Sequence, residues 1–199
     1  MASKPRAKSG AAAPTYQLKI VLKWSRPSIW RRVVVRADLS LHRLHDVIQI
    51  AMGWTDSHPH QFMVGSGRTP ICYGMRSSDG DGMGDTLDET RYAVWDLAPK
   101  PKGKFVYEYD FGDGWIHDVT VEKTLAVDAP FQHPVCLGGA NPCPPEDCGG
   151  VGGYYRLLEI LGNPKHPEYA DLKDWMGDGA ENARFDLDAV NEQLRRLKA

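Results

Sequence analysis

Residues 107–115 read Tyr-Glu-Tyr-Asp-Phe-Gly-Asp-Gly-Trp, and this stretch decides the centre of the fold. Asp113-Gly114 separates two runs of alternating apolar and polar residues, 104–110 and 115–122, and the dipeptide favours a tight turn with positive φ. The pattern predicts a β-hairpin. Because side chains alternate along a strand, His117 is expected to share the face of Trp115, whereas Asp118 lies on the opposite face.

The segments around this hairpin predict an α+β fold with a mainly antiparallel sheet of about five strands packed against several helices. Strands are expected at 16–24, 29–36, 61–64, 104–110 and 115–122. Helices are expected at 41–52, 154–161 and 167–176, and from the Asp186 cap to 197. The remaining long segments, 65–84 and the proline- and glycine-rich 130–153, are expected to lack regular structure.

Composition sets the broad class. The chain has 199 residues, 42% of them apolar and 25% charged, which is enough for one sizeable core. Residues 1–14 are small, basic and interrupted by proline, so we expect a disordered basic tail followed by a single α+β domain over 15–199. No apolar run approaches the roughly 20 residues of a membrane span, and the N-terminus lacks the apolar centre of a secretory signal. A cytoplasmic protein without membrane contacts is expected.

The four cysteines, Cys72, Cys136, Cys143 and Cys148, are more consistent with thiols or metal ligands than with a disulfide framework. Three of them lie in the segment 130–153, where they could gather zinc with His133. Their intervals of seven and five residues differ from the close cysteine pairs of typical zinc sites. Small buried thiols are the alternative interpretation.

Acidic residues and a histidine gather in and near the hairpin. Asp110, Asp113 and His117 could form a site for a metal-assisted hydrolase or nuclease with Glu146 and Asp147, if the later segment folds over the hairpin. A structural interpretation is also available, because aspartates stabilise turns by accepting backbone hydrogen bonds.

Charge is segregated along the chain. Residues 1–50 hold ten Lys and Arg against two Asp, a local excess of +8, so the net charge of −2 leaves −10 for the rest. One hypothesis is nucleic-acid binding through the basic N-terminal hairpin, with candidate residues Arg26, Arg31, Arg32 and Arg36. A solvated charged face is the alternative, since net charge bears only loosely on partners.

Three motifs together resemble the plasmid pRiA-type ORF-three-like family: residues 41–49 with Gly53-Trp54, residues 109–117, and residues 143–150, Cys-Pro-Pro-Glu-Asp-Cys-Gly-Gly. The resemblance spans about 16–197 and implies a compact α+β domain in a mobile-element-associated protein, since the family is also labelled transposon passenger or TnpR-like. It implies no established enzymatic activity. The early serines lie in a tail, a turn and a helix cap, which does not support resolvase chemistry. We therefore expect a non-catalytic binding or interaction module, with a protein or nucleic acid as partner.

Overall fold

The computed structural model describes residues 13–65, 69–75, 86–125, 131–177 and 184–197. The predicted N-terminal tail lies outside these residues except for Ala13 and Pro14. Most of the predicted long loop at 65–84 also lies outside them, but its described residues 71–74 form a strand, contrary to the prediction of irregular structure.

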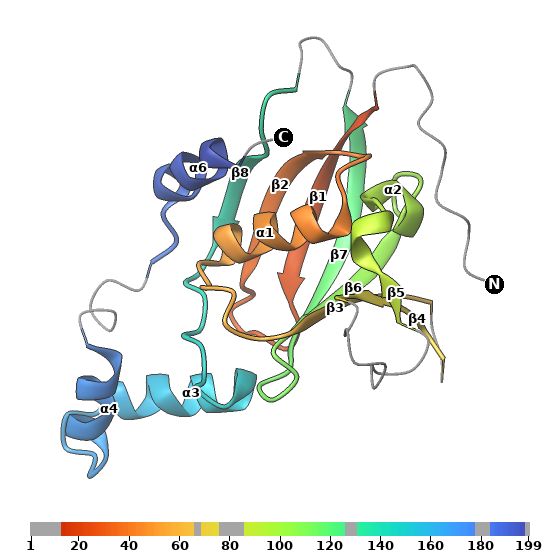
Figure 1. Ribbon diagram of the computed structural model, residues 1–199. Helices are drawn as coiled ribbons and strands as arrows, with labels where there is room; N and C mark the ends of the chain where they lie inside the picture. The colour runs from red at the N-terminus through yellow and green to blue at the C-terminus, as the bar shows by residue number, and fades with distance from the viewer. Residues whose placement is uncertain (1–12, 66–68, 76–85, 126–130, 178–183, 198–199) are drawn as a thin grey trace.

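One eight-stranded sheet organises the chain (Figure 1), with the spatial order β5-β4-β3-β6-β7-β1-β2-β8. Its strands are β1 (Thr15–Leu22), β2 (Trp30–Arg36), β3 (His60–Val64), β4 (Ile71–Gly74), β5 (Leu87–Asp88), β6 (Lys104–Tyr109), β7 (Trp115–Leu125) and β8 (Val135–Ala140). The chain is α+β overall, but the prediction of about five strands in a mainly antiparallel sheet is wrong. The sheet is mixed, because β4 and β5 are parallel while the other neighbours are antiparallel.

The edge strand β8 explains part of the error. It lies within the proline- and glycine-rich segment that was predicted to be irregular, and it pairs with β2. A Cβ on Gly139 would lie 2.7 Å from the Trp30 carbonyl oxygen and 2.8 Å from the Arg31 Cδ. Because glycine has no side chain, the two strands can approach each other closely here. From composition alone, a glycine-rich segment indicates a loop.

The predicted helix at 41–52 is α1 (Leu41–Met52), and it covers one face of the sheet (Figure 1). Ser40 caps its start by accepting a hydrogen bond from the Arg43 amide, and Gly53 ends it with φ 99°. Apolar residues of α1 and alternate residues of β1 are buried against each other in the core. The opposite face of the sheet carries charged pairs such as Arg32–Glu122, as expected for an antiparallel region with one solvated side.

The other helical elements are η1 (Glu89–Arg91), α2 (Val94–Leu97), α3 (Gly150–Leu161), α4 (Tyr169–Met176) and α6 (Leu187–Arg196). Asp186 caps α6, as the sequence predicted. The start of α3 lies four residues before the predicted one and takes in the glycine run. Among the described residues, no helix is both long and apolar enough to span a membrane.

Candidate functional site

The predicted hairpin is formed by β6 and β7, which pair from Lys104–Thr120 to Tyr109–Trp115. Two residues of its turn have left-handed backbone, Asp110 at φ 57° and Gly114 at φ 65°. The Gly114 amide donates to the Asp110 carbonyl oxygen at 2.7 Å. The Asp110 Oδ1 accepts from the amides of Gly112 at 2.9 Å and Asp113 at 3.3 Å, so one carboxylate oxygen holds the turn.

The segment after β8 folds over this turn. The Gly149 amide donates to the Asp113 Oδ2 at 3.1 Å, and the Trp54 indole donates to the Pro144 carbonyl oxygen at 3.0 Å. The Tyr109 hydroxyl donates to the Glu146 carboxylate. The proximity on which the sequence hypothesis depended is therefore present, and it brings the second acidic motif to the hairpin.

Three side chains converge where the two segments meet: His58, Asp110 and Asp147, hereafter the triad. One ligand atom from each lies within 4.8 Å of the others. The His58 Nε2 lies 3.2 Å from the Asp147 Oδ1 and 3.8 Å from the Asp110 Oδ2. The His58 Nε2 is shielded from solvent, and among the described residues it has no hydrogen-bond partner of acceptable geometry. The two carboxylates of the triad differ in solvent exposure: the Asp110 side chain is 9% exposed and that of Asp147 is 71% exposed.

The remaining predicted acidic candidates have structural contacts. Asp113 anchors the Gly149 amide. The Glu146 carboxylate accepts from Tyr109 through Oε1 and from the Thr55 hydroxyl through Oε2. Burial and this carboxylate both raise the pKa of Tyr109, so its hydroxyl remains a donor.

His117 lies away from the triad, inside the core. It is fully buried, and neither ring nitrogen has a hydrogen-bond partner among the described residues. Burial lowers the pKa of His117 to about 4, so the ring is neutral near pH 7. The structure therefore brings Asp110 and Asp147 together but separates both from His117.

The cysteine candidates do not join a metal-ligand group in the described part of the chain. Both groups of three or more potential ligands there consist of His and Asp. All four cysteines are free. Burial raises the pKa of Cys136, Cys143 and Cys148, that of Cys148 to about 12. His133 instead faces the Pro134 carbonyl oxygen at 2.9 Å.

Three of the four candidate arginines are already engaged. Arg31 is buried and donates to the carbonyl oxygens of Ala51 and Ala140, at the end of α1 and in β8. Arg32 forms two hydrogen bonds with Glu122, at 2.7 and 2.9 Å, and holds the pKa of that carboxyl at about 2. Arg36 pairs with Asp38 in the same two-bond manner, and Arg26 is exposed.

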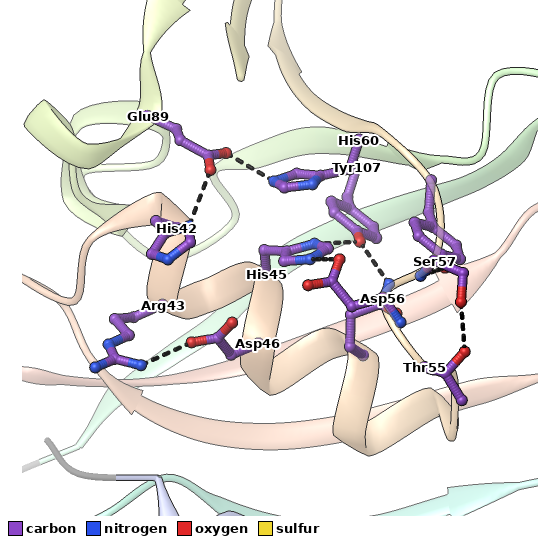
Figure 2. Close-up of polar contacts among 12 residues, drawn as sticks. His42, Arg43, His45, Asp46, Thr55, Asp56, Ser57, His60, Glu89 and Tyr107 are labelled. Atoms are coloured by element: carbon purple, nitrogen blue, oxygen red, sulfur yellow. Dashed lines mark hydrogen bonds and ion pairs between the residues drawn. The ribbon is translucent and has the colours of Figure 1, made fainter. Parts of the chain in front are cut away.

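A second polar cluster is distinct from the triad. It consists of His42, His45, Asp56, His60, Glu89 and Tyr107, and is called here the histidine network (Figure 2). Glu89 is fully buried and contacts His60 at 2.7 Å and His42 at 3.2 Å. His45 contacts Asp56 at 2.7 Å and the Tyr107 hydroxyl at 2.8 Å. Burial, followed by the neighbouring His60, lowers the pKa of His45.

The stacking of two imidazoles argues against a metal ion in the histidine network. The rings of His45 and His60 are 3.5 Å apart between centroids, with an interplanar angle of 7°. A metal ion must lie close to the plane of each imidazole that ligates it, along a nitrogen lone pair. An ion in the plane of one ring would lie well out of the other plane. The histidine network is therefore better suited to linking α1, β3 and η1 by hydrogen bonds.

Sequence reasoning missed His58, although a signal was present. Residues 55–60 read Thr-Asp-Ser-His-Pro-His and place three potential ligands in six residues between a helix stop and a strand. In the structure Asp56 and His60 belong to the histidine network, while His58 belongs to the triad. That division depends on how the segment enters β3, which the sequence pattern does not specify.

Comparisons with known proteins give a consistent result. A family model described as plasmid pRiA4b ORF-3-like protein matches residues 14–193. The uncharacterized protein y4hQ of Sinorhizobium fredii (strain NBRC 101917 / NGR234) is 34% identical over 190 residues, 94% of each chain. The crystal structure of MM3350 from Methanosarcina mazei Go1, a protein of unknown function, is similar with a TM-score of 0.74 and 31% identity. That similarity covers 89% of this chain and 98% of the other.

Proposed function

The chain belongs to the plasmid pRiA4b ORF-3-like family, and within it we propose that this protein is a binding module that holds one divalent transition-metal ion at the triad. The bound ion serves to anchor a further ligand, and the protein performs no chemical conversion.

The observation that carries the proposal is the state of the His58 Nε2. This atom is shielded from solvent, lacks a hydrogen-bond partner among the described residues, and lies 3.2 and 3.8 Å from two carboxylate oxygens. A shielded ring nitrogen that has two carboxylates in ion-pair range but no hydrogen bond of acceptable geometry calls for an explanation. A cation between the nitrogen and the two oxygens would satisfy all three atoms.

The donor set indicates the kind of ion. One imidazole and two carboxylates suit Mn²⁺, Fe²⁺, Co²⁺ or Zn²⁺, whereas Mg²⁺ and Ca²⁺ prefer oxygen ligands alone. Two carboxylates also offset the charge of a dication. Three protein ligands leave coordination positions open, as in sites that accept an exogenous molecule.

Binding is favoured over metal-assisted hydrolysis by the state of the neighbouring groups. Hydrolysis at a metal centre usually needs a free acid or base within hydrogen-bond reach. Glu146 already accepts from Tyr109 and Thr55, and His117 lies in the core. Neither group is free to transfer a proton at the triad.

Calorimetric titration of the EDTA-stripped full chain with Co²⁺ and Zn²⁺ tests the proposal. We expect one ion per chain, and an affinity that falls at least about tenfold in Asp147→Asn and in His58→Gln, which equals about 1.4 kcal/mol. Asp118→Asn removes an exposed carboxylate that pairs with Lys23 and should leave the affinity unchanged. Cys148→Ser should also leave it unchanged. Absence of stoichiometric binding, or loss of binding in Cys148→Ser alone, would refute the triad as the site.

A further inference from the structure

A hollow of about 230 Å³ lies between α3 and α4, next to the triad. Asp147 belongs to both features: its Oδ1 lies 3.2 Å from the His58 Nε2, and the residue lines the hollow. Leu157 and Ile160 of α3 form one wall, and Leu172 and Trp175 of α4 form part of the other. The hollow is thus acidic at one end and mostly apolar along its walls.

The apolar wall on α4 is not sealed by the protein itself. This helix has no buried residue, and Trp175 is 50% exposed. A surface helix normally buries its apolar stripe against the core. Here the stripe faces a hollow that remains open to a ligand.

Charges along the walls are already paired. The Arg156 Nη2 contacts both oxygens of Glu168 at 2.8 Å, which joins α3 to α4 across the hollow. Cys148 also lines the hollow. The uncompensated polarity therefore lies at the Asp147 end, where the proposed ion would bind.

The beginning of α3 adds a preference for negative charge at that end. Cys148 and Gly153, which flank its first residues, line the hollow. The first turn carries no acidic residue and no side-chain cap, although Asp113 takes the amide of Gly149. The N-terminus of a helix and a divalent cation both attract an anionic group.

We infer that this hollow binds the apolar body of a small organic carboxylate whose head group completes the coordination of the ion at the triad. The inference rests on the proposed function. The volume lies below the roughly 300–1,000 Å³ typical of drug-sized sites, so the apolar body is no larger than a branched aliphatic or single aromatic group. A positively charged head group fits less well, because an ammonium has no lone pair with which to bind the ion and the α3 N-terminus disfavours positive charge.

The visible absorption spectrum of the Co²⁺-loaded full chain provides the test, because it responds to a change in the ligands of the ion. Acetate, 3-methylbutanoate and 3-methylbutan-1-ol are titrated separately. We expect 3-methylbutanoate to bind at least about tenfold more tightly than acetate, since burial of its additional carbons is favourable. The alcohol, which has the same apolar body without the carboxylate, should bind at least about tenfold more weakly than 3-methylbutanoate.

Two leucine variants locate the apolar body. Leu172→Asp places a charge in the hollow and should abolish the preference for 3-methylbutanoate over acetate, with Co²⁺ affinity kept within twofold. Leu158→Asp is the matched control, because Leu158 lies on α3, is 46% exposed and does not line the hollow. It should keep the preference.

The outcomes separate the two proposals. If Co²⁺ does not bind, both the proposed function and this inference fail. If Co²⁺ binds but acetate and 3-methylbutanoate bind equally, only the inference fails. Equal binding of the alcohol would show that the head group is not a carboxylate, and a preference that persists in Leu172→Asp would place the apolar body elsewhere. Either result overturns the inference.

Discussion

Asp110 performs two tasks with its two carboxylate oxygens. Oδ1 holds the turn through the Gly112 and Asp113 amides, while Oδ2 faces His58. Its left-handed backbone at φ 57° also suits aspartate and asparagine better than most other residues. These two tasks can be separated by substitution.

Asp110→Asn should keep the turn, because asparagine tolerates the same backbone and retains an acceptor oxygen. We expect a loss of stability below about 1 kcal/mol, together with at least a tenfold loss of Co²⁺ affinity. Asp110→Ala should lower both, with a stability loss of about 1–3 kcal/mol from the lost turn hydrogen bonds. Urea unfolding and calorimetric titration on both variants provide the comparison. Equal stability of the two variants would contradict the structural task of Oδ1.

His117 should make the protein sensitive to acid. Its pKa is about 4 in the folded state, below the ordinary value of 6.5, because burial disfavours the charged ring. A depressed histidine pKa means that the unfolded chain binds the proton first. Stability is therefore unaffected above about pH 6.5 and falls as the pH drops from 6.5 to about 4, by about 3 kcal/mol in total.

His117→Phe should remove this contribution, since phenylalanine cannot be protonated and fits an apolar core. Chemical unfolding at pH 7 and pH 4.5 measures the effect. The difference in stability between the two pH values should be smaller in the variant, with a remainder from His45, whose pKa is also lowered. His133→Phe serves as a half-buried control. An unchanged pH dependence in His117→Phe would contradict the assignment.

At the scale of elements, the glycine run 149–153 gives α3 its starting point. A Cβ on Gly153 would lie 1.9 Å from the Cys148 carbonyl oxygen, whereas a Cβ on Gly152 meets nothing within 4 Å. At Gly150, with φ 69°, a Cβ would lie 2.4 Å from the Asp113 carbonyl oxygen. The glycines thus allow the helix to begin directly against the hairpin turn, which is what brings Asp147 close to Asp110.

Two alanine substitutions in this helix should therefore differ in their effect on stability. Gly153→Ala should destabilise the protein by about 1–3 kcal/mol through overpacking against backbone. Gly152→Ala should be neutral or stabilise it by up to about 1 kcal/mol, because alanine favours the helix. Thermal unfolding of the two variants checks the order. Similar effects at both positions would argue against the close packing of α3 on the hairpin.

Glu89 joins three elements through the histidine network. It lies in η1, contacts His42 of α1 and His60 of β3, and has a side chain that is 1% exposed. These two histidine contacts outweigh the effect of burial and lower the pKa of Glu89, so the carboxylate is charged in the folded state.

Glu89→Gln should cost about 3–5 kcal/mol, the usual cost of removing one partner from a buried ionic contact. Denaturant unfolding near pH 7 gives the value. Glu108→Gln is the control, since Glu108 is a half-buried strand residue that accepts from Gln61. A loss no greater in Glu89→Gln than in this control would mean that the network contributes little to stability.

For the molecule as a whole, several elements could be predicted from sequence patterns within or next to them. The hairpin, α1 with its cap and stop, the β1–β2 pair and the Asp186 cap each follow from residues near in sequence. The strand β8 and the first turn of α3 could not be predicted in this way. Both depend on glycines that admit a neighbouring backbone, and composition does not distinguish such a contact from a loop.

The candidate site was predictable in part. Asp110 and Asp147 were among the candidates predicted from the sequence, on the condition that the later segment folds over the hairpin. The sequence did not identify His58 or exclude His117, because the first depends on the path of 54–60 and the second on which face of β7 is buried. Part of the basic excess in residues 1–50 is explained by contacts within the protein. Arg32 and Arg36 pair with carboxylates, and Arg31 lies in the interior.

Anomalous diffraction from crystals of the full chain soaked in Co²⁺, collected at the cobalt absorption edge, tests the central claim most directly. The structure predicts one strong peak between the His58 Nε2, the Asp110 Oδ2 and the Asp147 Oδ1, and its loss in crystals of Asp147→Asn. A strong peak at the cysteines or within the histidine network, or no peak at the triad at saturating Co²⁺, would contradict the claim that these three side chains form the metal-binding site.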